Sequence, residues 1–150
     1  MDKEFKKDIE VDLENLARLI GEMTEIMDKV KNEPDFITTR AAGSIIHDFY
    51  CGVEKIFERI ALNIDGSMPQ GEDWHTKLLL QMTRPVNKRK STVIDSEFIQ
   101  DLKEYLRFPH LFRNIYGFEL MWARIKPLCV KLNDVYKEFK AKIEKFLECL

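Results

Sequence analysis

Apolar residues recur at intervals of three and four along most of this 150-residue chain. At its start they are Phe5, Ile9, Leu13, Leu16, Ile20, Met23, Met27 and Val30. This spacing places side chains on one face of an α-helix, whereas a half-buried strand needs strict alternation. No segment alternates long enough to make a strand. The sequence therefore predicts an all-α protein.

Capping and helix-breaking residues mark where the first helices begin and end. The first helix ends before Pro34, because proline cannot continue a helix that precedes it without disruption. Asp35 or Thr38 can cap a second helix, since both side chains accept hydrogen bonds from free backbone N–H groups. A loop follows, and a short third helix starts near Asp73.

The remaining segments complete a predicted bundle of about five helices. A fourth helix runs from a cap at Asp95 or Ser96 to Leu106, and a long last helix carries apolar residues from Phe118 to Phe146 on one broad face. Short connections favour antiparallel neighbours, so we expect one antiparallel helical domain spanning residues 1–150. The apolar stripes are rich enough for a second copy to pack against, and we expect a homodimer.

Composition narrows the classes of function. A net charge of −2 gives the whole molecule no attraction to nucleic acid, so any contact with RNA must be local. Cys51, Cys129 and Cys149 have no CxxC spacing, which argues against a disulfide framework or a thiolate zinc site. No apolar run approaches the ~18 residues of a membrane span. We expect a cytoplasmic protein that needs no metal or other cofactor.

Residues 107–120 carry the densest set of reactive side chains, reading Arg-Phe-Pro-His-Leu-Phe-Arg-Asn-Ile-Tyr-Gly-Phe-Glu-Leu. Proline fits the first turn of a helix, so we expect a helix to start at Pro109, with His110, Arg113 and Asn114 on one face. Free N–H groups at that start, with Arg107 just before it, would favour a phosphate. His110 can exchange a proton near neutral pH. Together they suggest metal-free cleavage of a phosphodiester.

A structural role for the same residues remains open. In that alternative His110 caps the helix start, Arg113 pairs with Glu104 or Glu119, and Tyr116 fills the core. The sequence does not decide between the two interpretations.

The stretch at residues 107–120 resembles the signature region of HEPN domains, and among them the HepT-like group found beside small nucleotidyltransferases in toxin–antitoxin modules. Residues 40–57 and 65–79 are similar to the second and third helices of that group, and the resemblance covers roughly residues 9 to 140. It implies a helical homodimer whose two motif regions face a shared cleft. It also implies a metal-independent endoribonuclease, a minimal nucleotidyltransferase antitoxin as partner, and attachment of AMP to Tyr116.

The match has one departure. The HEPN ribonuclease motif is Arg, four to six residues, then His, often followed by one residue and Tyr. Here Asn114 precedes Tyr116 by two positions where the motif has His, and Pro109 lies five before it where Arg is expected. The candidate catalytic residues are therefore Arg107, His110, Arg113, Asn114 and Tyr116.

Other residues are candidates for supporting roles. By the resemblance, Asp48 or Glu54 of the second helix would orient His110. Four basic residues in a loop could follow an RNA backbone, or be merely solvated: Arg84, Lys88, Arg89 and Lys90. His47 and Cys51 have a zinc-compatible spacing but no second ligand pair nearby, and His75 is expected to make a structural contact.

Two functions follow from these residues. The first is a metal-independent endoribonuclease toxin that acts as a dimer. The second is a non-catalytic HEPN module that binds a nucleotidyltransferase, a nucleotide or RNA without cleavage, and it is favoured by the loss of the strict motif.

Overall fold

The computed structural model describes residues 3–86, 89–116 and 119–150, with the side chains of residues 109–113 outside the description. The helices are α1 (Lys3–Lys29), α2 (Phe36–Ile60), α3 (Trp74–Gln81), α4 (Phe98–Asn114) and α5 (Trp122–Glu148). A π-helical turn, η1 (Ala61–Asp65), prolongs α2. Within these ranges the β structure is confined to an isolated bridge between Val86 and Arg89. The predicted all-α fold of about five helices is confirmed.

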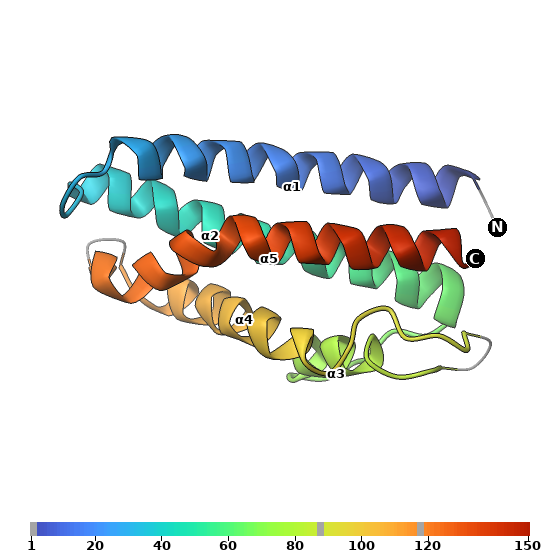
Figure 1. The fold of residues 1–150 in the computed structure, drawn as a ribbon. Coiled ribbons are helices and arrows are strands. Elements are labelled where there is room, and N and C mark those ends of the chain that lie inside the picture. The colour runs from blue at the N-terminus through green and yellow to red at the C-terminus, as the bar shows by residue number, and fades with distance from the viewer. Residues whose placement is uncertain (1–2, 87–88, 117–118) are drawn as a thin grey trace.

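Three long helices, α1, α2 and α5, lie side by side, and α4 with the short α3 covers the opposite side of α2 (Figure 1). The start of α1 and the end of α5 lie at the same end of the bundle (Figure 1). Buried apolar residues from all five helices form one hydrophobic core. None of the helices in the described ranges combines the length and apolarity that a membrane crossing requires.

The helices α1 and α2 approach closely at Gly52. A Cβ atom placed on this glycine would lie 2.5 Å from the Cδ2 atom of Leu16, which is too near for two carbon atoms. The hydroxyl of Tyr136 donates to the carbonyl oxygen of Leu13 at 3.1 Å and so ties α5 to α1. The contact of Leu16 with the backbone of α2 at Gly52, and the buried hydrogen bond of Tyr136, therefore hold α1 against α2 and α5.

Asp35 is the N-cap residue of α2, and Asp95, two residues before the N-cap position of α4, accepts a hydrogen bond from the first residue of that helix. The Oδ1 atom of Asp35 accepts from the Thr38 N–H at 2.8 Å, and that of Asp95 accepts from the Phe98 N–H at 2.7 Å. An ion pair with Lys142 of α5, followed by this capping bond, holds the pKa of Asp95 below its ordinary value. Asp95 thereby joins the start of α4 to α5.

The predicted helix start at Pro109 is wrong. The helix α4 runs without a break from Phe98 to Asn114, so Pro109 lies in its interior. Leu102, Tyr105 and Phe108 are buried on one face of α4, and burying such side chains stabilises the helix by roughly 1.5–3 kcal/mol each. Together this exceeds the cost of about 3 kcal/mol for an internal proline. The predicted set of free N–H groups at Pro109 therefore does not exist.

The start of the last helix also differs from the prediction. Met121 has an extended backbone, with φ −104° and ψ 126°, and α5 begins at Trp122. Phe118, which the apolar pattern assigned to this helix, lies outside the described residues. An apolar pattern records which side chains are buried, and it continues across a turn when the turn also packs against the core.

A buried ion pair anchors the loop between α3 and α4. The side chains of Arg89 and Asp65 are 1% and 0% exposed, and the Arg89 Nε atom lies 2.6 Å from Asp65 Oδ1. The guanidinium group also donates to the carbonyl oxygens of Gln81, Arg84 and Ser91. The Gln81 side chain donates to Asp65 at 2.8 Å. This network joins η1, the end of α3 and the loop.

We predict that Arg89→Met lowers the free energy of unfolding by about 3–5 kcal/mol, because it leaves the Asp65 carboxylate buried without its cation. Chemical denaturation followed by circular dichroism measures the change. The matched control is Lys90→Met at the exposed neighbouring position, which should have little effect. A double variant with Asp65→Leu should recover much of the loss. Equal stability of Arg89→Met and the native protein would contradict the network's role.

Candidate site between α4 and α5

The described candidate residues from residues 107–120 lie at the end of the bundle where α4 meets α5. Arg107 is exposed on α4, Asn114 is exposed as its last residue, and Tyr116 follows two residues later. The side chains of His110 and Arg113 lie outside the described residues. Because α4 is continuous, Arg107 and Asn114 are positioned on the surface of a helix and not at its N-terminus.

Tyr116 is exposed, and its backbone is hydrogen-bonded to Glu119. Its side chain is 70% exposed. The Tyr116 N–H donates to Glu119 Oε1 at 3.1 Å, and the Glu119 N–H donates to the Tyr116 carbonyl oxygen at 2.9 Å. The alternative in which Tyr116 fills the core is therefore wrong, and the phenol is accessible to a partner.

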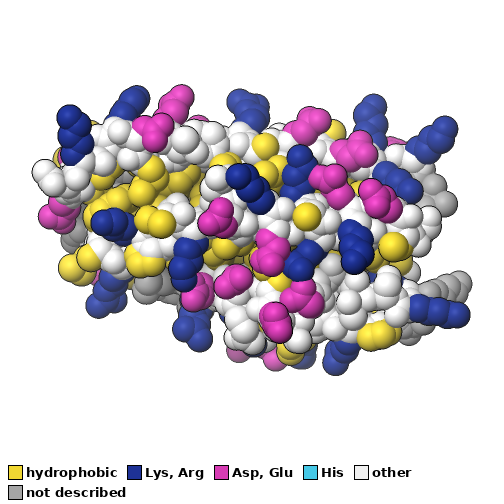
Figure 2. Space-filling view, in the orientation of Figure 1, with side chains coloured by type: hydrophobic (Ala, Val, Ile, Leu, Met, Phe, Trp, Pro, Cys, Tyr) yellow, Lys and Arg dark blue, Asp and Glu magenta, His cyan; other side chains and the backbone are white. Residues whose placement is uncertain are grey.

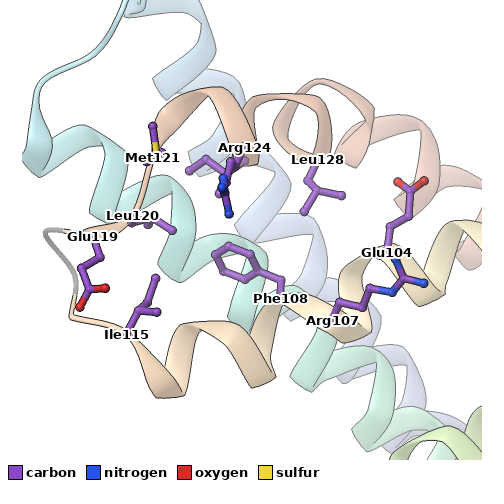
Figure 3. A pocket seen from close by; sticks show the side chains of 10 residues that line it. Glu104, Arg107, Phe108, Ile115, Glu119, Leu120, Met121, Arg124 and Leu128 are labelled. Carbon is purple, nitrogen blue, oxygen red and sulfur yellow. The ribbon is translucent and has the colours of Figure 1, made fainter.

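A cavity of about 380 Å³ lies between the second half of α4, the following turn and the start of α5. The described residues that line it are Glu104, Arg107, Phe108, Ile115, Glu119, Leu120, Met121, Arg124, Ile125 and Leu128. In Figure 3, Arg124 reaches into the cavity from α5, with Arg107 and Glu104 at one end and Glu119 at the other. The cavity thus combines an apolar floor with charged ends.

Among the described lining residues, Arg107 and Arg124 are the cations of this cavity. Within the described residues neither the Arg107 nor the Arg124 guanidinium forms an ion pair. Glu104, in contrast, lies 3.8 Å from the Nζ atom of Lys131. Glu119 is hydrogen-bonded to the backbone of Tyr116. As far as the described residues go, the cavity therefore offers two arginines outside any ion pair and two carboxylates that already have partners.

Arg124 was missed by reasoning from the sequence. It is the third residue of α5, where the free N–H groups make a cation unfavourable, and the first turn of α5 contains no acidic residue. A cation at the positive end of a helix is a signal of function, but it becomes visible only once the start of α5 is known. The apolar pattern had placed that start further upstream.

Tyr105 is a buried residue of α4 next to cavity-lining residues, and it contacts both α2 and α5. Its ring packs edge-on against Phe49 of α2, with centroids 5.5 Å apart, and its hydroxyl donates to the carbonyl oxygen of Leu128 at 2.8 Å. Burial raises the pKa of Tyr105 above its ordinary value, so the phenol stays protonated and keeps donating. These contacts hold α2, α4 and α5 in fixed positions around the cavity.

The two candidate orienting carboxylates have other partners. Glu54 Oε2 lies 2.6 Å from His75 Nδ1, and the Trp74 ring stacks on His75 with centroids 3.6 Å apart. Asp48 lies 3.5 Å from the neighbouring His47 and is largely exposed. Glu54 therefore links α2 to α3, and whether either carboxylate also reaches His110 falls outside the described residues.

His47 and Cys51 come together without forming a described metal site. The Cys51 Sγ atom lies 3.9 Å from His47 Nε2. Among the described residues there is no group of three or more potential ligand side chains placed to hold a metal ion. The i, i+4 pair is therefore a local contact on α2.

The basic residues of the loop between α3 and α4 differ in exposure. Arg84 and Lys90 are exposed, whereas Lys88 lies outside the described residues. Arg89 requires a correction, because its guanidinium is buried and bound to Asp65 and is not available to an RNA backbone. The sequence pattern could not separate these residues, since a run of basic residues does not reveal a distant acidic partner.

We predict that Tyr105→Phe lowers the free energy of unfolding by about 1 kcal/mol, because the buried hydrogen bond to Leu128 is lost. Tyr116→Phe is the matched control at an exposed position and should change stability by less than about 0.5 kcal/mol. Chemical denaturation of both variants measures the difference. Equal losses would show that Tyr105 does not hold the cavity together as described.

Comparison with known proteins identifies the family. The model of the HepT-like protein family matches residues 41–150, which run from within α2 to the end of α5 and beyond it to the last residue. Comparison with curated proteins and with solved structures gives no match. The matched residues include the buried ion pair, the cavity and every described candidate in residues 107–120. The chain belongs to the HepT-like family.

Proposed function

We propose that this protein is the RNA-directed component of a toxin–antitoxin module and acts as a metal-independent endoribonuclease. The observation that carries the proposal is the display of Arg107, Asn114 and Tyr116 beside one cavity in a HepT-like chain. Charged and polar groups that converge on an apolar cavity are the usual composition of a ligand site. Their exposure suits a large substrate such as RNA.

The proposed chemistry needs a cation for the phosphate and a group that exchanges a proton. Arg107 binds the scissile phosphate and stabilises the charge that develops on it. The ribose 2′-hydroxyl attacks phosphorus and the bond to the 5′-oxygen breaks, which leaves a 2′,3′-cyclic phosphate. His110 either takes the proton of the 2′-hydroxyl as general base or gives a proton to the leaving 5′-oxygen as general acid, and water carries the other proton. Arg113 assists in holding the phosphate, and Asn114 and Tyr116 position the substrate. Since α4 has no free N–H groups at Pro109, the N-terminus of α4 cannot supply the positive charge that Arg107 and Arg113 provide in this proposal.

The active form is proposed to be a homodimer whose two α4–α5 ends face a shared cleft. Apolar side chains gather at the end of the bundle between the end of α1 and the start of α5, while charges of both signs are spread over the rest of that face (Figure 2). Met121 before α5 and Phe36 at the start of α2 are exposed, at 57% and 67%. Exposed apolar residues of this size favour contact with another protein surface.

A non-catalytic binding module is the second candidate. The observation that favours it is Asn114, which stands where the ribonuclease motif has histidine and cannot exchange protons near neutral pH. In this alternative the same surface binds a minimal nucleotidyltransferase, a nucleotide or RNA without cleavage. The display of Tyr116 supports docking of such a partner.

We predict that the purified protein cleaves single-stranded RNA in the presence of EDTA. His110→Ala should lose at least about 100-fold in rate, the usual contribution of a general acid or base. Arg107→Ala should lose a similar factor, because one stabilising donor for the transition state is removed. Arg18→Ala, on the exposed face of α1, is the matched control and should retain full activity.

Circular dichroism and size-exclusion chromatography establish that all variants are equally folded and equally dimeric. No cleavage by the native dimer at any pH would reject the endoribonuclease and leave the binding module. Cleavage that persists in His110→Ala would reject only the role of His110 and would leave the endoribonuclease activity in place.

We predict that co-expression with a minimal nucleotidyltransferase adds AMP to Tyr116, because this phenol is exposed in a turn. Mass spectrometry of the tryptic peptide that contains Tyr116 detects the adduct. The adduct should be absent in Tyr116→Phe, while the buried Tyr105 should remain unmodified in both proteins. An unmodified Tyr116 in an active enzyme pair would contradict the prediction.

A further inference from the structure

We propose that the cavity between α4 and α5 binds one unpaired nucleotide, with Arg124 as the main phosphate ligand. This inference rests on the proposed RNA-directed function and specifies the part of the substrate that the site holds. It also assigns a binding role to a residue outside the 107–120 stretch.

The size and floor of the cavity suit a base and its sugar. A volume of about 380 Å³ lies within the range of small-molecule sites. Phe108 and Ile125 are buried beneath it, and Leu120 and Leu128 are half-buried at its sides. An apolar lining favours contact with the face of a base over contact with a fully polar group.

In this proposal the guanidinium group of Arg124 binds the phosphate of the nucleotide. Figure 3 shows its side chain pointing into the cavity from the first turn of α5, on the same side as Phe108. The free N–H groups at the start of α5 add to its positive charge, which makes the position unfavourable unless an anion is bound. A guanidinium group binds phosphate through paired hydrogen bonds. Arg107 at one end of the cavity can bind the next phosphate along the strand.

The carboxylates explain why a nucleotide fits better than a simple anion. Glu104 and Glu119 line the cavity and would repel a free phosphate or a fatty acid. A nucleotide offers ribose hydroxyls and exocyclic amino groups, which donate hydrogen bonds to carboxylates. The cavity therefore matches a ligand that has an apolar ring, an anion and several donors.

A nucleotide can enter this cavity only if its base is not stacked between its neighbours in the RNA. A base in a duplex is held by pairing and stacking, and its face is not available to the apolar lining of the cavity. The site therefore selects single strands, loops or ends over a regular duplex.

Isothermal titration calorimetry of the full chain with 5′-AMP in EDTA tests the proposal. The native protein should bind 5′-AMP, and Arg124→Ala should weaken binding at least about 10-fold, since it removes a charge-assisted contact. Met121→Glu adds a negative charge at an exposed position of the lining and should weaken binding too. Arg18→Ala is the matched control and should bind as the native protein does. Ribose 5-phosphate and adenosine should each bind more weakly than 5′-AMP.

The outcomes separate this proposal from the endoribonuclease. Binding of 5′-AMP that depends on Arg124, in a protein that does not cleave RNA, supports the nucleotide site and rejects the enzyme. A single-stranded oligonucleotide that binds more tightly than 5′-AMP, and a duplex that does not compete, identify RNA as the source of the nucleotide. No binding of 5′-AMP or the oligonucleotide by the native protein would overturn the proposal. Equal affinity in the native protein, Arg124→Ala and Met121→Glu would also overturn it.

Discussion

The packing of Tyr105 is the interaction on which the candidate site depends. This fully buried residue of α4 contacts Phe49 of α2 through its ring and α5 through its hydroxyl, so one side chain joins three helices. Phe108, one turn further along the same buried face, forms part of the cavity floor. The position of Arg107, which lies between these two buried aromatic residues in the sequence, therefore follows from core packing.

The continuity of α4 changes how the site can attract an anion. Because α4 continues through Pro109, Arg107 and Asn114 lie on the surface of one helix. The positive end of that helix is at Phe98, far from both residues. The helix N-terminus that does face the cavity belongs to α5, where Arg124 adds its own charge. The described charged residues of the lining are two arginines and two glutamates, so the positive charge of the site is confined to Arg107, Arg124 and the start of α5.

Much of the fold could be predicted from the sequence, because the spacing of apolar residues and the caps at Asp35 and Asp95 are local signals. The continuation of α4 through Pro109 could not be predicted, since burial of Tyr105 and Phe108 outweighs the local preference of proline for a helix start. The role of Arg89 depends on Asp65, which is distant in sequence. Arg124 gave no signal until the start of α5 was known. The resemblance of residues 107–120 to the HepT-like group did identify the correct family.

Nuclear magnetic resonance mapping of single-stranded RNA on the isotope-labelled protein tests the central claim most directly. If the α4–α5 end is the functional site, the largest amide shifts will fall around Arg107, Asn114, Tyr116 and Arg124, and the exposed face of α1 will not respond. Shifts concentrated instead around Arg84 and Lys90 would place RNA on the loop between α3 and α4. That result would contradict the account, because the cavity and its arginines would then have no part in binding RNA.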